Sequence, residues 1–228
     1  MDGTGRAAVA ELVATFAFVL VAAGAATTAG FGLDLTGVAL ASGLALAAMV
    51  SVAARRSGGM VNPAVAVGLW IAGRLSGPRA AVLVLAQILG AVAAGYLLRY
   101  VVPGTAFDVA AGGTPALASG VASGKGIVVE AAATFVLVFA WFGTLADPRG
   151  PPSRAAGLTV GLVLAAGIMA FGPYTGAAAN PARWFGPALA SGVWSDWFVW
   201  VVGPLAGGVI AAALYAAAFL RGVEPDTP

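Results

Sequence analysis

Long apolar runs separated by short polar or glycine-rich stretches dominate the chain. Six of these runs have roughly the length of about 20 residues that a helix needs to cross a bilayer. They predict spanning helices at about 7–29, 37–54, 78–99, 126–145, 155–172 and 197–220. The longest connection, 103–125, is rich in glycine, alanine and serine and is expected to be a loop, and 147–154 predicts a tight polar turn.

Two further apolar runs are shorter, and each follows the tripeptide Asn-Pro-Ala. The first motif is Asn62-Pro63-Ala64 with a run to residue 72, and the second is Asn180-Pro181-Ala182 with a run to residue 190. Asn is a preferred helix N-cap and Pro is favoured at the first helical position. Both motifs therefore predict half-helices that start inside the membrane and do not cross it.

The composition agrees with a membrane protein. The 228 residues are 61% hydrophobic and 9% charged, whereas a soluble domain carries about 25% charged residues. We expect one transmembrane domain over residues 1–228 and a retained first span, because its apolar run exceeds a typical signal-peptide core. Cys and His are absent, so we expect no metal site and no cofactor, and nothing resembles a nucleic-acid-binding face.

The charges predict the orientation. With both termini in the cytoplasm, the inner side would carry eight arginines, and the outer side only Arg99 and Lys125. The inner set is Arg6, Arg55, Arg56, Arg74, Arg79, Arg149, Arg154 and Arg221. Because cytoplasmic loops carry an excess of Lys and Arg, we expect a multi-pass protein of the plasma (inner) membrane with cytoplasmic termini.

The two halves of the chain repeat. Glu11 lies 51 residues before Asn62, Glu130 lies 50 residues before Asn180, and each Glu is followed at the same spacing by Thr-Phe. Three spans in each half put the second half in the opposite orientation, which predicts an inverted repeat of about 7–101 and 126–220. Half-helices at corresponding positions of such repeats are typical of a permeation or binding site near the midplane.

The predicted site favours neutral solutes. Two helix N-termini, each with about half a positive charge, would repel cations and protons at the midplane, and Arg183 would add a fixed positive charge. Asn62 and Asn180 could offer amide N–H groups to a solute. The intramembrane acids Glu11 and Glu130 are interpreted as braces for the half-helix loops, and the alternative is a proton relay.

These motifs, together with Asn-Pro-Ala-Arg183-x-Phe-Gly-Pro, closely resemble the aquaporin family, the major intrinsic proteins. The resemblance implies an all-α bundle of six transmembrane helices plus two re-entrant half-helices, and a homotetramer with one pore in each protomer. It also implies an outer selectivity filter at Ser42, Ile168, Ala177 and Arg183. Met60 replaces a usual pore-lining His.

The four filter residues are most similar to those of nodulin-like intrinsic proteins and related bacterial channels. Small side chains in the filter predict a wide constriction, provided that Trp184, Phe171 and Tyr174 stay out of the lumen. We therefore expect a passive channel for glycerol, urea, boric or arsenous acid and water.

Other functions remain as alternatives. The first is a water-selective channel with an unusual filter. A less favoured alternative is a proton-coupled secondary transporter that uses Glu11 and Glu130. Arg183 argues against a cation channel, and an anion pore would need a second lumenal cation. An enzyme is not expected, because His is absent as a base and no Ser–Lys pairing is evident.

Overall fold

The computed structural model describes residues 3–29, 32–151 and 153–223, with the side chains of 153 and 154 left out. Residues 30–31 and 224–228 and the side chain of Arg154, one of the arginines predicted for the inner side, thus lie outside the described part. The spanning helices are α1 Gly3–Thr27, α2 Leu35–Ser57, α4 Gly77–Val101, α6 Ser123–Trp141, α7 Ser153–Thr175 and α9 Val199–Phe219. The half-helices are α3 Pro63–Ile71 and α8 Pro181–Ser191, and the described residues contain no strand.

The prediction of six spans and two half-helices is confirmed, with two differences. The connection at 103–125 is not only a loop, because it contains helix α5 Gly104–Val109 and the 3₁₀ turn η2 Ala111–Gly113. Helix α6 continues into one π-helical turn, η3 Phe142–Ala146, before the polar turn. All six long helices are apolar enough to cross a membrane, and the protein is a multi-pass membrane protein.

The helix ends of the first half show why these residues form helices. The Asp34 side chain accepts a hydrogen bond from the backbone N–H of Gly37 at 2.8 Å and caps α2. Gly58, at φ 97°, ends the same helix in a left-handed conformation that suits glycine. Arg55 and Arg56 lie in the last turn of α2, where positive charge is favourable beside the helix dipole.

Glycines allow the spanning helices of each half to approach closely. A Cβ on Gly90 in α4 would lie 2.2 Å from the backbone oxygen of Leu12 in α1. A Cβ on Gly207 in α9 would lie 2.0 Å from the backbone oxygen of Ala131 in α6. Because both separations are impossible for real atoms, only glycine fits at these two crossings, as is common between membrane helices.

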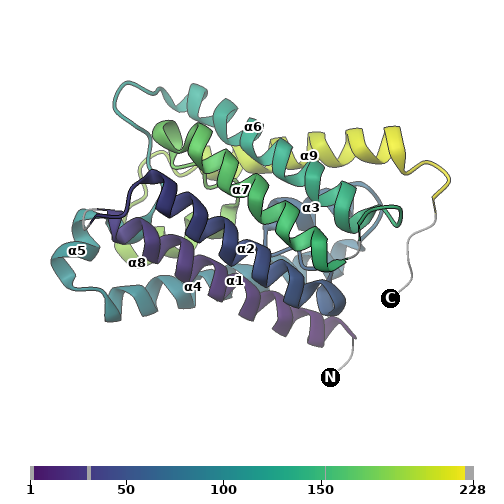
Figure 1. The fold of residues 1–228 in the computed structure, drawn as a ribbon, viewed down its shortest axis with the longest axis horizontal. Helices are drawn as coiled ribbons and strands as arrows, with labels where there is room; N and C mark the ends of the chain where they lie inside the picture. Colours follow the sequence, from purple (N-terminus) through teal and green to yellow (C-terminus); the bar gives the residue numbers. More distant parts are fainter. Residues whose placement is uncertain (1–2, 30–31, 152, 224–228) are drawn as a thin grey trace.

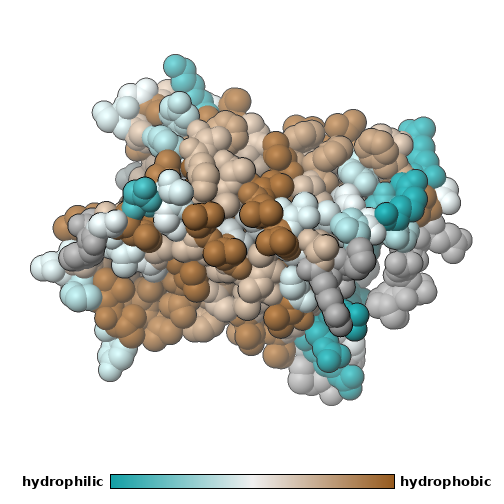
Figure 2. Space-filling view, viewed as in Figure 1, coloured by the Kyte–Doolittle hydropathy of each residue, from teal (hydrophilic) through white to brown (hydrophobic). Residues whose placement is uncertain are grey.

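The helices form one elongated bundle whose long axis follows the spans (Figure 1). Helix α1 begins and α9 ends at the same end of the bundle, which we call the terminal end. Helix α3 lies in the part of the bundle nearer the terminal end, and α8 lies in the part nearer the opposite end (Figure 1). Brown apolar side chains cover the middle of the bundle, and hydrophilic residues gather nearer its ends (Figure 2).

Candidate functional site: two half-helices and two cavities

The two half-helices meet at their N-terminal ends through their Asn residues. The Asn62 side-chain oxygen accepts from the backbone N–H of Ala64 at 2.9 Å. The Asn180 oxygen accepts from Ala182 at 3.0 Å and from Arg183 at 3.2 Å. Each Asn is therefore the N-cap of its half-helix, in extended backbone conformation.

The Asn side chains also connect the two halves to one another. Asn62 Nδ2 donates to the backbone oxygen of Ala179, and Asn180 Nδ2 donates to that of Val61, both at 2.8 Å. A carboxamide has two N–H donors. The second N–H of each Asn has no protein acceptor among the described residues. Each amide thus keeps one donor for a small polar molecule.

Glu11 on α1 holds the segment that leads into α3. Its carboxylate accepts hydrogen bonds from the backbone N–H groups of Met60 at 3.0 Å and Val61 at 2.7 Å. It also accepts from the Ser57 hydroxyl at 2.5 Å and from Gln87 Nε2 at 2.7 Å. Sequence reasoning missed Gln87, although an amide within an apolar span could have marked it as a partner for a buried acid.

Glu130 on α6 makes the corresponding contacts with the segment that leads into α8. It accepts from the backbone N–H groups of Ala178 at 3.1 Å and Ala179 at 2.8 Å. The Thr175 hydroxyl donates to it at 2.7 Å. Both glutamates have 0% exposure, so neither carboxylate meets solvent.

Both connecting segments have backbone in the left-handed region. The positive φ angles are 67° at Gly59 and 52° at Val61 in the first segment, and 44° at Ala177 and 47° at Ala179 in the second. This conformation costs about 1–2 kcal/mol for a residue with a side chain. Val61 and Ala179 are held in it because their N–H groups donate to the glutamates and their backbone oxygens accept from the crossed Asn side chains.

A cavity of about 390 Å³, named the outer cavity after the predicted orientation, lies at the end opposite the termini. Ile168 and Arg183 line it together, while Ser42 and Ala177 are buried but are not among its lining residues. The Ser42 hydroxyl donates to the backbone oxygen of Val38 at 2.7 Å. The structure therefore brings two of the four predicted filter side chains to this cavity.

The connection between α4 and α6 also contributes to the outer cavity, which the sequence did not reveal. Gly113, Thr114, Pro115 and Ala116 line it. Arg183 Nη1 donates to the backbone oxygen of Gly113 at 2.9 Å. This contact fixes the guanidinium group at the cavity wall and joins two segments 70 residues apart in the chain.

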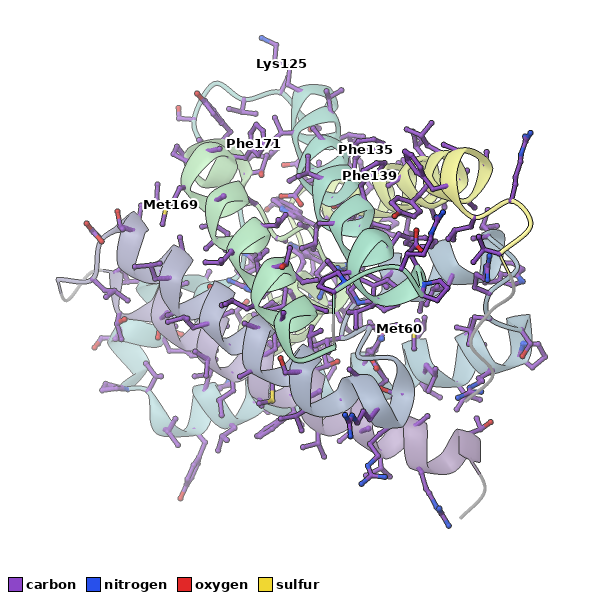
Figure 3. The ribbon with its side chains drawn as sticks, turned by 45° about the vertical axis from the view of Figure 1, so that its right-hand side comes forward. Met60, Lys125, Phe135, Phe139, Met169 and Phe171 are labelled. Atoms are coloured by element: carbon purple, nitrogen blue, oxygen red, sulfur yellow. The ribbon has the colours of Figure 1, made fainter. Side chains whose placement is uncertain are left out.

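An inner cavity of about 350 Å³ lies at the terminal end. Met60 lines it and is otherwise buried, with 2% exposure. Figure 3 shows Met60 inside the bundle, whereas Lys125 projects away from it at the start of α6. Trp141 also lines this cavity, and its indole N–H donates to the backbone oxygen of Gly59 at 3.1 Å.

The three aromatic residues that could have narrowed the lumen do not line either cavity. Trp184 is 1% exposed and stacks on Trp200, with ring centroids 5.6 Å apart and an interplanar angle of 2°. Phe171 is partly buried against the core, and Tyr174 is half exposed on the bundle surface. Within the described ranges no group of three or more Asp or Glu side chains could hold a metal ion.

Comparisons with known proteins agree with this geometry. The family model for the major intrinsic proteins matches residues 3–215. The chain is 45% identical to aquaporin TIP4-4 of Zea mays, over 98% of this chain and 91% of that protein. It is 40% identical to aquaporin TIP2-1 of Arabidopsis thaliana, over 96% and 89% of the two chains.

A solved structure shares the fold. The aquaglyceroporin from Plasmodium falciparum superposes with a TM-score of 0.84 at 23% identity, covering 96% of this chain and 98% of that one. Helix number, the paired half-helices and the sequence matches point to the same conclusion. The chain belongs to the major intrinsic protein family, the aquaporins, and is a membrane channel rather than an enzyme.

Proposed function

We propose that this channel conducts small uncharged, mostly hydroxylated solutes together with water. The main support is the outer cavity, because none of its described lining residues is aromatic. Ile168 gives it an apolar wall, and Arg183 supplies donors at a fixed position. Solute selectivity follows the diameter and lining polarity of a pore, so glycerol, urea and boric or arsenous acid are the proposed solutes.

The site residues take the following proposed roles. Asn62 and Asn180 donate their remaining amide N–H groups to passing solutes, and the positive ends of α3 and α8 exclude cations and protons. Ser42, Ile168, Ala177 and Arg183 form the outer filter, and Met60 lines the inner path. Glu11 and Glu130 brace the loops, a role supported by the hydrogen bonds that they accept from the backbone N–H groups of these loops.

We further propose one channel domain built as an inverted repeat, which assembles as a homotetramer with both termini in the cytoplasm. The sequence predicts the plasma membrane, but the relatives reported above do not favour this membrane over another. The likeness of the filter to nodulin-like proteins rests on the four residues alone, because the relatives reported above are TIP aquaporins.

A water-selective channel is the second candidate, since proteins named as aquaporins are 40–45% identical over nearly the whole chain. Stopped-flow light scattering of proteoliposomes separates the two candidates. Vesicles shrink in an impermeant osmolyte in both cases. Fast reswelling in glycerol, beyond that of empty vesicles, supports the solute pore, and fast water flux without reswelling supports the water channel.

A matched pair of variants on α7 sharpens this experiment. Ile168→Phe narrows the outer cavity and should reduce glycerol flux at least tenfold. Leu162→Phe lies on the same helix at a side chain that is 54% exposed on the bundle surface, so its flux should equal that of the wild type. Glycerol uptake that collapses with an uncoupler would instead indicate proton-coupled transport.

A further inference from the structure

The inner cavity is unusually rich in positive charge. Arg55, Arg56, Arg74 and Arg79 all line it, and no acidic side chain is among the lining residues that the structure describes. The positive-inside rule accounts for the side of the membrane on which these arginines lie. It does not account for their convergence on one cavity, because arginines on exposed loops would satisfy the same rule.

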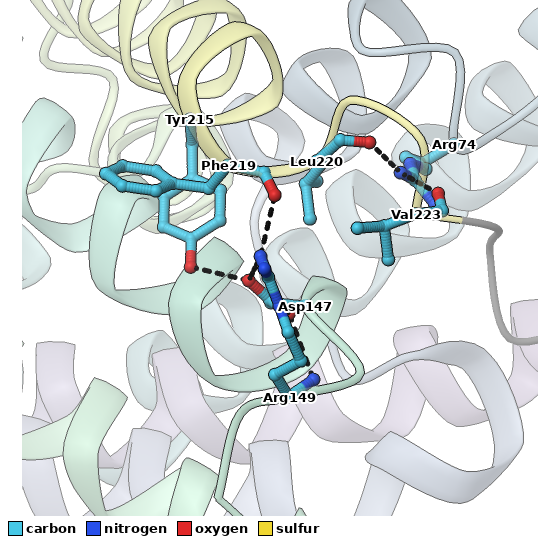
Figure 4. A network of polar contacts seen from close by, with 7 residues as sticks. All are labelled: Arg74, Asp147, Arg149, Tyr215, Phe219, Leu220 and Val223. Carbon is cyan, nitrogen blue, oxygen red and sulfur yellow. Dashed lines mark hydrogen bonds and ion pairs between the residues drawn. The ribbon is translucent and has the colours of Figure 1, made fainter.

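Two of these guanidinium groups have buried nitrogen atoms without a hydrogen-bond partner. Arg74 donates through Nη2 to the backbone oxygens of Leu220 at 3.2 Å and Val223 at 2.8 Å (Figure 4). Its Nη1 atom and the Nε atom of Arg79 are buried and unpartnered. A buried donor without an acceptor is costly, and a ligand with several oxygen atoms would remove that cost at both atoms.

Among the residues that the structure describes, the acids near the cavity already have other partners, and Glu11 accepts hydrogen bonds from the lining residues Ser57 and Met60. Arg79 lies in the first turn of α4, where the helix dipole adds positive charge and a cation is disfavoured. Asp147 follows the lining residue Ala146, but it forms an ion pair with Arg149 at 2.7 Å and accepts from the Tyr215 hydroxyl (Figure 4). The Arg149 guanidinium holds the pKa of the Asp147 carboxyl well below its usual value. Asp147 is therefore already paired with Arg149.

We propose that the inner cavity is a binding site for a phosphate-bearing anion. Guanidinium groups bind phosphate oxygens through paired, charge-assisted hydrogen bonds. The volume of about 350 Å³ falls within the range of about 300–1,000 Å³ that is usual for ligand sites. The anion comes either from solution or from the headgroup of a membrane lipid.

Occupation of this site has a consequence for flux. Met60 lines the same cavity, so a bound anion stands at the inner mouth of the path and reduces solute flow. This consequence rests on the proposed function, whereas binding itself does not. The test below therefore measures binding alone, so that its failure is distinguishable from failure of the proposed function, which the flux experiments test.

The test uses two probes on the full-length chain. Inorganic pyrophosphate is titrated calorimetrically into the detergent-solubilised protein, and thermal stability is compared in lipid nanodiscs with and without phosphatidic acid. The variant Arg79→Gln removes an unpartnered guanidinium. Arg6→Gln is the control, because it removes the same charge from an exposed side chain of α1 that does not line the cavity.

We expect either one bound pyrophosphate per chain or thermal stabilisation by phosphatidic acid. In Arg79→Gln, the pyrophosphate affinity should fall at least tenfold, or the stabilisation by phosphatidic acid should be lost. Arg79→Lys should retain more binding than Arg79→Gln, and Arg6→Gln should match the wild type. Pyrophosphate binding identifies a soluble anion, and a response to phosphatidic acid alone identifies a headgroup. No binding of either probe, or equal weakening by Arg6→Gln, would overturn the proposal.

Discussion

The segments that lead into α3 and α8 share three corresponding contacts with their glutamates, and the first segment's glutamate has a fourth, with Gln87. Glu11 receives hydrogen bonds from Ser57, Met60, Val61 and Gln87, whereas Glu130 receives them from Thr175, Ala178 and Ala179. The cap shows the opposite bias, because Asn180 accepts from two backbone N–H groups and Asn62 from one. The first half therefore has more hydrogen bonds to its glutamate, and the second half has more at its N-cap.

The two halves share their backbone geometry and the Glu and Asn-Pro-Ala residues, whereas other side chains at corresponding positions differ. Gly59 and Ala177 occupy corresponding positions, three residues before each Asn, and both are left-handed. Val65 and Arg183 also correspond, three residues after each Asn. Only the second half therefore carries a charge at its half-helix, and this asymmetry places Arg183 at the outer cavity alone.

Replacing Glu130 should have the largest effect on stability. Glu130→Gln places an NH₂ group against the N–H of Ala179 and should lower stability by about 3 kcal/mol. Glu11→Gln should lower stability less. The Gln87 side-chain amide can rotate so that its unpartnered Oε1 atom accepts a hydrogen bond from the new NH₂ group. Thermal unfolding in detergent measures both variants.

The double variant Glu11→Gln with Gln87→Met tests that explanation. Without the Gln87 acceptor, Glu11→Gln should lower stability as much as Glu130→Gln does. If Glu11→Gln costs as much as Glu130→Gln while Gln87 is intact, the proposed compensation is wrong.

The Asn caps should differ in the other direction. Asn180→Ala leaves two backbone N–H groups of α8 without their acceptor, and Asn62→Ala leaves one in α3. Loss of an N-cap costs about 0.5–2 kcal/mol, so we expect Asn180→Ala to be the more destabilising of the two by about 1 kcal/mol. Equal melting temperatures would contradict the assignment of the stronger cap to the second half.

Gly59→Ala should be destabilising although alanine is native at the corresponding Ala177. A Cβ on Gly59 would lie 2.7 Å from the backbone oxygen of Val50. Relief of this overlap requires backbone movement, at a cost of about 1–3 kcal/mol. A melting temperature equal to that of the wild type would show that the first segment has more room than its geometry indicates.

The reverse exchange, Ala177→Gly, should give the smallest effect. Glycine adopts the observed φ of 44° without steric penalty, and relief of that strain should give a net stabilisation of about 0.5 kcal/mol. Ala178→Gly is the control, because the backbone of Ala178 is not left-handed. This variant should destabilise the protein. Destabilisation by Ala177→Gly would show that the left-handed conformation carries no strain.

Much of the fold follows from residue patterns that act locally. Apolar runs bounded by arginines and glycines predict the six spans, and Asn-Pro steps predict the starts of α3 and α8 at the residues observed. The helix α5 escaped prediction because Gly104–Val109 is short and lacks a periodic apolar pattern. The contacts of Gln87 with Glu11 and of Gly113 with Arg183 join distant segments, and spacing along the chain carries no signal for them.

We propose that the paired half-helix ends, Asn62, Asn180 and Arg183 form a path for neutral molecules and not for protons. The most direct test measures osmotic water flux and proton flux in the same proteoliposomes, with empty vesicles as the reference. We expect water flux well above the reference and proton flux equal to it. Proton flux that rises with the amount of protein would contradict the claim.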